Sequence, residues 1–273
     1  MIALPGHLCA MPGFLIVNPR AGNDSPSADE LAAAAERLGI TAHLLARDED
    51  PAEVARAAPE GPLGIAGGDG SLGAVAAVAI ERERPFVCVP FGTRNHFARD
   101  VGLDRDDPLA ALAAFQGHER RIDVGRANGR VFLNNVSVGM YASLVYRREH
   151  HRRRGEALAR VRALGRAFRE WHPRFVVDGE PVDARIILVA NNRYRLDLLS
   201  LGERDSLESG RLFLYVAHGV VRHSWEERSG AAFELDTSVS RFKAAFDGEP
   251  GLVEAPLRCT VEPRALRLLL PPG

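Results

Sequence analysis

Three short polar segments in the first half of the chain carry residue types that could bind phosphate. They are Asn18-Pro19-Arg20-Ala21-Gly22, Gly67-Gly68-Asp69-Gly70-Ser71 and Pro90-Phe91-Gly92-Thr93-Arg94-Asn95. Glycine lets a backbone approach a ligand closely, and the amide groups at the start of a helix can bind phosphate oxygens. Asp69 adds a carboxylate. By itself the second segment could equally be a tight acidic turn, but three such segments favour a phosphate-binding site.

Each segment follows an apolar run with the length of a buried strand. The runs cover residues 14–17, 63–66 and 86–89, with a further strand expected at 41–45 and helical patterns at 27–38, 52–57 and 72–83. Ser27 and Glu30 have the spacing of a capping box at the start of the first helix. This alternation predicts an α/β domain with a doubly wound parallel sheet, whose ligand site lies at the carboxyl ends of the strands.

After about residue 123 the sequence becomes rich in short β-like runs. They cover residues 131–138, 175–177, 185–190, 211–216, 232–235 and 266–270. Short strands bounded by turns predict a β-sandwich, here with an arginine-rich helical insert at 147–171. We therefore predict two domains, an α/β domain over residues 12–123 and a β-sandwich over residues 124–273.

Composition excludes several classes of protein. The 273 residues are 46% hydrophobic and carry a formal net charge of -1, which argues against a nucleic-acid binder because phosphate backbones require a broad positive field. Lys243 is the only lysine, so a P-loop lysine is absent. Cys9, Cys88 and Cys259 are far apart, which fits neither a disulfide framework nor a zinc site and favours a reducing cytoplasm. No run reaches the roughly 20 apolar residues needed to span a bilayer.

Further segments extend the pattern along the chain. They are Gly92-Thr93-Arg94-Asn95-His96-Phe97-Ala98-Arg99, Ile122-Asp123-Val124-Gly125 and Asp247-Gly248-Glu249. With the first two loops, and in this order, they resemble the diacylglycerol kinase catalytic family, which includes bacterial lipid kinases and sphingosine kinases. The resemblance implies a phosphofructokinase-like ATP-binding domain, a β-sandwich lipid-substrate domain, and Mg²⁺ with ATP. The implied reaction phosphorylates a hydroxyl of diacylglycerol or a related lipid.

The resemblance also implies roles for individual residues. Those expected to contact the nucleotide are Asn18, Arg20, Gly22, Gly67, Gly68, Gly70, Ser71, Gly92, Thr93 and Asn95. Asp69 is the expected base and Glu249 is expected to help hold Mg²⁺ through water, although these roles could be exchanged. A metal network would comprise Asp69, Asp123, Asp247 and Glu249.

Several of these positions have structural alternatives. Asp123 could instead anchor the crossover between the domains, and Asp247 with Gly248 could form only a hairpin turn. Asn134 and Asn135 lie beside an apolar run, where buried hydrogen bonding is the favoured interpretation.

The chain departs from the family pattern at Ala74, His96 and Ser209, which stand where many relatives place acids. These departures leave a reduced activity open. Two other functions remain as alternatives, a soluble-substrate kinase resembling NAD kinase and a nucleotide- or lipid-binding regulator without turnover.

The insert at 147–171 contrasts with the nearly neutral chain. It contains nine arginines and three acids, a local charge of +6, and its apolar residues repeat every three to four positions. Such an amphipathic helix suits an anionic membrane surface, although a helix packed on the sandwich with a solvated arginine face is equally consistent. We expect a cytoplasmic protein associated peripherally with the membrane. Exposed strand edges leave pairing with a second copy open.

Overall fold

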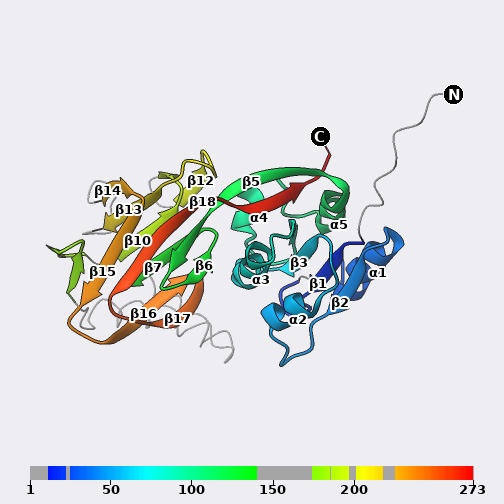
Figure 1. The fold of residues 1–273 in the computed structure, drawn as a ribbon, viewed down its shortest axis with the longest axis horizontal. Helices are drawn as coiled ribbons and strands as arrows, with labels where there is room; N and C mark the ends of the chain where they lie inside the picture. Colours follow the sequence, from blue (N-terminus) through cyan, green and yellow to red (C-terminus); the bar gives the residue numbers. More distant parts are fainter. Residues whose placement is uncertain are drawn as a thin grey trace. The chain divides into compact units, whose positions relative to one another are not determined.

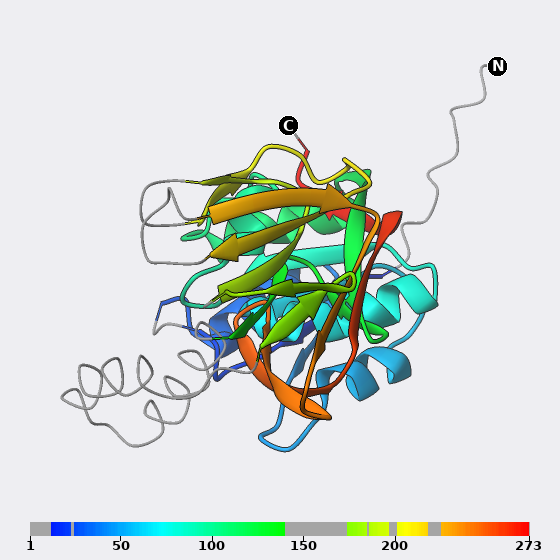
Figure 2. The same cartoon turned by 90° about the vertical axis from the view of Figure 1, so that its left-hand side faces the viewer.

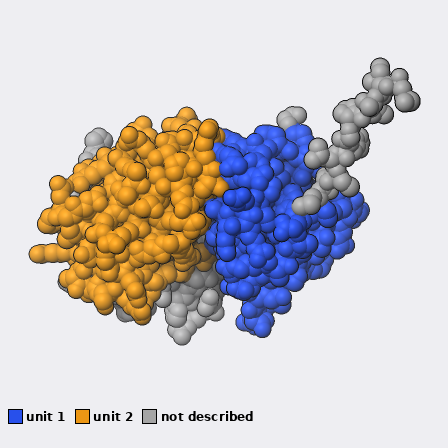
Figure 3. Space-filling view, in the orientation of Figure 1, with its two compact units in different colours: residues 1–121, 266–273 blue, residues 122–265 orange. Residues whose placement is uncertain are grey.

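The computed structural model describes residues 12–22, 25–139, 174–184, 186–196, 201–217 and 225–272 (Figure 1). The chain divides into two compact units, one of Met1–Arg121 with Leu266–Gly273 and the other of Ile122–Ala265 (Figure 3). The first boundary lies close to the predicted one. The last residues differ from the prediction, because they return to the first unit and add a strand to its sheet.

The first unit contains a parallel sheet in the order β2-β1-β3-β4. Its strands are β1 (Phe14–Val17), β2 (Thr41–Leu44), β3 (Leu63–Gly67) and β4 (Phe86–Pro90). The end of the long strand β18 (Leu257–Leu270) pairs in parallel with β4, with Leu268 opposite Phe86. The sequence therefore predicted these four strands, but it placed residues 266–270 in the wrong domain.

Helices cover both faces of this sheet. They are α1 (Ala28–Arg37), α2 (Pro51–Ala57), α3 (Asp69–Glu81), α4 (His96–Asp100) and α5 (Pro108–Ala111), followed by the 3₁₀ helix η1 (Leu112–Gln116). α1 and α5 pack in one apolar cluster with Leu15, Val17 and Val87, while α2 and α3 lie on the other side of the strands (Figure 1). This layering on two faces leaves the carboxyl ends of the strands at an edge.

The start of α1 has the predicted capping box. The Ser27 hydroxyl accepts a hydrogen bond from the Glu30 amide (3.2 Å), and the Glu30 carboxylate accepts one from the Ser27 amide (2.7 Å). By contrast, α3 begins at Asp69 and not at the predicted Leu72. Glycines in its first turn have low helix propensity, so the sequence pattern concealed this start.

The second unit contains a six-stranded antiparallel sheet in the order β14-β13-β10-β7-β16-β17. These strands are Trp225–Gly230, Leu212–Ala217, Ile186–Asn191, Asn135–Gly139, Arg241–Phe246 and Glu249–Glu254, respectively. A short hairpin of β11 (Tyr194–Leu196) and β12 (Leu201–Arg204) accompanies it. Figure 2 shows the strands of this unit after a 90° turn of the view in Figure 1 about the vertical axis.

A second antiparallel layer is formed by the start of β18 and its neighbours. They are β5 (His118–Ala127), β6 (Arg130–Phe132), β8 (Phe175–Val177), β9 (Glu180–Val182) and β15 (Ala232–Thr237). Alternate side chains of the two layers meet in one apolar core, for example Val136 and Val189 with Phe233 and Leu257. The second half is thus an antiparallel sheet domain, as the sequence predicted.

Two details of the sandwich differ from the sequence prediction. The run at 131–138 is not one strand, because β6 ends at Phe132 and β7 begins at Asn135. The polar strands β14, β16 and β17 were missed, since charged residues interrupt their apolar pattern. The predicted helix at 147–171 lies outside the described residues. No helix among the residues described above is long and apolar enough to cross a membrane.

The capping box provides a stability test. We expect Ser27→Ala to lower the free energy of unfolding by about 1 kcal/mol, because the Glu30 amide in the first turn of α1 loses its hydrogen-bond acceptor. Thermal melting would measure the change. Ser137→Ala is the matched control, because the buried Ser137 hydroxyl has no hydrogen-bond partner in the described part of the chain. Equal losses in the two variants would contradict the assigned role of the capping box.

Candidate functional site

The three polar segments meet at one edge of the parallel sheet. β3 lies between β1 and β4, with Val17 opposite Ala66 and Ala66 opposite Val89. Since all three strands run in the same direction, the segments that follow them leave the sheet at the same edge. We name them loop 1 (residues 18–22), loop 2 (67–71) and loop 3 (90–95).

Glycines bring the backbones of loops 2 and 3 into contact. A Cβ atom on Gly92 would lie 2.5 Å from the Cα atom and 3.1 Å from the nitrogen of Gly68. Loop 1 touches loop 3 in a similar way, because a Cβ atom on Gly22 would lie 2.4 Å from the Phe91 ring. Real Cβ contacts are longer, so Gly92 has no room for a side chain, and at Gly22 the Phe91 ring would have to move. The three loops therefore pack against one another, loops 2 and 3 through backbone and loop 1 through the Phe91 ring.

Loop 2 leads directly into α3. Gly68 is the N-cap residue and forms no side-chain capping bond. The Ser71 hydroxyl donates to the Gly68 carbonyl oxygen (2.9 Å), and this bond closes the turn. A helix start made of glycine amides, with no side-chain cap over it, is the arrangement that binds phosphate in many nucleotide sites.

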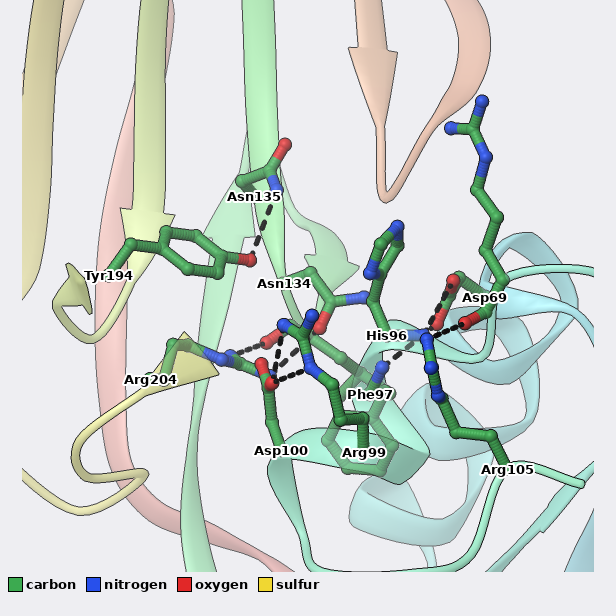
Figure 4. Close-up of polar contacts among 12 residues, drawn as sticks. Asp69, His96, Phe97, Arg99, Asp100, Arg105, Asn134, Asn135, Tyr194 and Arg204 are labelled. Carbon is green, nitrogen blue, oxygen red and sulfur yellow. Dashed lines mark hydrogen bonds and ion pairs between the residues drawn. The ribbon is translucent and has the colours of Figure 1, made fainter. Parts of the chain in front are cut away.

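Asp69 joins loop 2 to the helix that follows loop 3. One carboxylate oxygen of this half-buried residue accepts a hydrogen bond from the His96 amide (3.2 Å), and the other from the Phe97 amide (3.1 Å) (Figure 4). The carboxylate thus has a set orientation at the glycine-rich edge.

Asn95 shapes loop 3. Its backbone is left-handed, with φ of 47°, and its side chain is buried. The side-chain oxygen accepts from the Gly92 amide (2.8 Å), while the side-chain nitrogen donates to the carbonyl oxygens of Gly92 (2.8 Å) and Arg105 (3.3 Å). These bonds engage both N–H groups of the side chain within the protein, while the contact of Asn95 with a nucleotide stays a prediction. Thr93 remains exposed.

His96 lies close to Asp69 without a charge of its own at neutral pH. Burial lowers the pKa of the His96 imidazole below its usual range, and the nearby Asp69 carboxylate opposes this shift only in part.

Loop 1 is braced from two sides. The Asn18 amide donates to the Ala66 carbonyl oxygen of β3 (2.9 Å), and the Asn18 side chain accepts from the Arg20 amide (3.1 Å). The Arg20 guanidinium donates to the Arg47 carbonyl oxygen, on the loop after β2. The sequence analysis did not include the loop after β2 among the loops of the site, because this loop contains no glycine motif. The available signal was that β2 runs parallel to β1, so the loop after it leaves the sheet at the same edge.

In the second unit, Asp123 acts as an anchor. Its side chain is 1% exposed, and its two oxygens accept hydrogen bonds from the amides of Gly210 (2.7 Å) and Arg264 (2.9 Å). This geometry favours the anchoring interpretation over a metal ligand. Ser209, one of the departures from the family pattern, donates from both its amide and its hydroxyl to the Asn192 side-chain oxygen.

Asp247 and Gly248 form the turn between β16 and β17, with φ angles of 49° and 86°. Asp-Gly therefore forms a hairpin turn, and its expected part in a metal network stays a prediction. The Asp247 carboxylate also accepts hydrogen bonds from three backbone amides in the segment between β6 and β7. Glu249 is the exposed first residue of β17. No group of three or more His, Cys, Asp or Glu side chains in the described ranges is placed to hold a metal ion.

Asn134 and Asn135 belong to a buried polar cluster, as the sequence analysis favoured. The Asn134 side-chain oxygen accepts from Arg204 (2.8 Å), and the Asn135 side chain donates to the Tyr194 hydroxyl (3.2 Å) (Figure 4). Asn191 donates to the Asp123 carbonyl oxygen (2.9 Å). The sequence analysis missed Asn191, Tyr194 and Arg204, because nothing in a local pattern shows that they converge.

Comparisons with known proteins find similarity in sequence over part of the chain and similarity in fold. Residues 12–127 match the family described as "Diacylglycerol kinase catalytic domain". A diacylglycerol kinase of Bacillus subtilis is 40% identical over 84 residues, which are 30% of this chain and 28% of that protein. A probable lipid kinase, YegS-like, of Pseudomonas aeruginosa is 44% identical over 89 residues, 32% of this chain and 29% of the relative. The matched segments thus span less than a third of these relatives.

The likeness to solved structures extends over the whole chain. A crystal structure of a diacylglycerol kinase from Bacillus anthracis has a TM-score of 0.66 and covers 95% of this chain and 96% of its own. A second structure, of a putative diacylglycerol kinase from the same organism, has a TM-score of 0.65. Sequence identities are 17% and 18%, so this likeness concerns the fold.

The contact between loops 2 and 3 can be tested by adding one methyl group. We expect Gly92→Ala to destabilise the first unit by roughly 1–3 kcal/mol, because the new Cβ atom meets backbone and cannot be avoided by a rotamer change. Gly251→Ala is the control, since its nearest neighbour at 3.4 Å is the end of the Arg130 side chain. Chemical denaturation would compare the two. Similar stabilities would show that the loops can separate without cost.

Proposed function

Because residues 12–127 belong to the diacylglycerol kinase catalytic-domain family, we propose that the protein is an ATP-dependent lipid kinase. The proposed reaction transfers the γ-phosphoryl group of ATP to a hydroxyl of diacylglycerol or a related lipid. One structural observation supports it above the others: loops 1, 2 and 3 meet at the carboxyl edge of a parallel sheet, with Gly68 and Gly92 backbone to backbone.

ATP is the proposed donor. Phosphate oxygens would bind the amides of loop 2 at the start of α3, where Gly67, Gly68 and Gly70 permit close approach. The site lacks a P-loop lysine, since Lys243 is the only lysine of the chain. A phosphofructokinase-like mode of nucleotide binding, in which backbone amides and arginines hold the phosphates, is part of this proposal.

Mg²⁺ fits the donor set of this edge. It commonly binds one or two carboxylates together with substrate phosphates and water, and Asp69 supplies a carboxylate beside the proposed phosphate site. When bound, the ion would offset phosphate charge. Asp123 and Asp247 fit less well as direct ligands, because Asp123 is 1% exposed and the Asp247 carboxylate already accepts hydrogen bonds from three backbone amides.

The proposed catalytic roles remain with two acids. Asp69 is the proposed base for the acceptor hydroxyl, since its carboxylate is held in one orientation by two amides. Glu249 is the proposed second acid, which helps to hold the metal through water. That assignment rests on the sequence resemblance.

A transfer assay tests the function directly. γ-labelled ATP and Mg²⁺ would be offered with a panel of lipids and, separately, with soluble acceptors that include NAD. Label on a lipid supports the proposal. Label on NAD alone would favour the soluble-substrate kinase, and nucleotide binding without any transfer would favour the regulator.

Asp69→Asn tests the proposed base in the same assay. We expect turnover to fall roughly 10²–10⁴-fold, as is typical when a general acid or base is removed, with ATP binding largely retained. A small loss of stability should accompany it, because Asp69 also caps α4. Asp29→Asn, an exposed acid on α1, is the matched control. Turnover like that of the wild type in the Asp69 variant would refute its assignment.

Membrane association is proposed from the sequence of residues 147–171. Replacing Arg152, Arg153 and Arg154 with Gln should weaken binding to anionic vesicles by roughly 3 kcal/mol at most, given about 1 kcal/mol per basic residue. High salt should have the same effect, because it screens surface charges. The control removes three exposed arginines of the sandwich, Arg193, Arg241 and Arg258. Equal vesicle binding by both triple variants would contradict a specific role for the insert.

A further inference from the structure

Three successive backbone amides converge on one carboxylate in the second unit. The amides of Leu133, Asn134 and Asn135 donate to Asp247 at 2.9, 2.7 and 2.9 Å. The Asp247 amide in turn donates to the Asn135 carbonyl oxygen at 2.8 Å. Four hydrogen bonds therefore attach the β16–β17 turn to the segment between β6 and β7, which we call the clamped segment (residues 133–135).

The turn alone does not explain an aspartate at this position. Its left-handed backbone, with φ of 49° at Asp247 and 86° at Gly248, is adopted by Asn-Gly as readily as by Asp-Gly. The three amides make the difference. A carboxylate offers two acceptor oxygens, whereas an asparagine side chain would turn an NH₂ group toward at least one N–H donor.

Arg204 holds the same segment from its carbonyl side. The guanidinium is 6% exposed and donates to the Leu133 carbonyl oxygen (2.6 Å) and the Asn134 side-chain oxygen (2.8 Å). Asn191 adds a second donor to the Leu133 carbonyl oxygen (3.1 Å). The amides of the clamped segment thus bind a carboxylate, while the Leu133 carbonyl oxygen and the Asn134 side-chain oxygen bind a guanidinium cation. The two opposite charges polarise the peptide groups between them in the same direction, which strengthens these hydrogen bonds.

The hydrogen bonds between Asp247 and the clamped segment restrict the position of the Glu249 backbone. Phe246 and Glu249 are opposite each other in the hairpin register, so the two turn residues alone connect β16 to β17. β16 also pairs with β7, with Phe246 opposite Val136. Once Asp247 is bound to the clamped segment, the backbone at Glu249 has little freedom to move relative to β7.

We propose that Asp247 and Arg204 are positioning residues that hold Glu249 in place through the clamped segment. This positioning role rests on the proposed function, because Glu249 is one of the two acidic residues proposed to take part in phosphoryl transfer. It differs from the metal network expected from the sequence, in which Asp247 would belong to the Mg²⁺ site, directly or through water. In the proposal, Asp247 binds amides and acts only through its neighbours.

Asp247→Asn separates the two roles. We expect kcat to fall roughly 10–100-fold, because small displacements of a reacting group are costly, while the KM for ATP and the half-saturating Mg²⁺ concentration stay unchanged. Amide hydrogen exchange, measured without Mg²⁺, should speed up in peptides containing residues 133–135. A metal ligand would behave differently, with a raised Mg²⁺ requirement and unchanged exchange.

Two further variants keep the test decisive. Arg204→Lys keeps the charge but loses the planar fork, so it should show the same changes to a smaller extent even if Asp247→Asn folds poorly. Arg241→Gln is the matched control, because it removes an exposed ion pair with Glu254 at the other end of the same hairpin (2.8 Å) and should change neither readout.

The outcomes distinguish this inference from the proposed function. An active wild-type protein whose kcat survives Asp247→Asn would overturn the positioning role alone. Absence of lipid phosphorylation by the wild type would overturn the proposed function, and hydrogen exchange would still decide whether the clamp exists. Unchanged exchange in both the Asp247 and the Arg204 variants would overturn the clamp.

Discussion

A carboxylate that is removed from solvent on folding needs hydrogen-bond donors from the protein. In this protein, backbone amides are the donors at Asp69, Asp123 and Asp247. In each case the donor lies far away in the sequence. The carboxylate therefore joins two chain segments and cannot be replaced by an amide without loss. Asp69 uses it just after β3 and Asp247 in the turn after β16, whereas Asp123 uses it within β5.

The consequence for function is different in the two units. In the first, the amides come from the start of α4, and they turn Asp69 toward a glycine-rich edge that can accept phosphate. In the second, Asp123 is 1% exposed between two amides, and Asp247 accepts hydrogen bonds from three amides. The same interaction thus orients the acid that we propose for the chemistry and ties the other two to neighbouring backbone.

Glycine contacts complete the first of these arrangements. Gly68 and Gly92 allow two loop backbones to touch, and Gly22 leaves room for Phe91 against loop 1. Asn95 then closes loop 3 on itself with its own side chain. A surface built from backbone leaves few side chains with which to hold phosphate, which agrees with a chain that has a single lysine.

The sequence by itself determined the strands at 14–17, 63–66 and 86–89, the capping box of α1, the antiparallel second half and the meeting of three loops at one edge. These features follow from local periodicity and from the rule that parallel strands share an edge, so a local pattern suffices. Only the tertiary structure decided that residues 266–270 return to the first sheet, that residues 131–138 break at the clamped segment, and that Asn191, Tyr194 and Arg204 converge. Those outcomes depend on hydrogen bonds between residues many positions apart. A buried donor takes whichever acceptor the fold brings to it, and no spacing in the sequence records that choice.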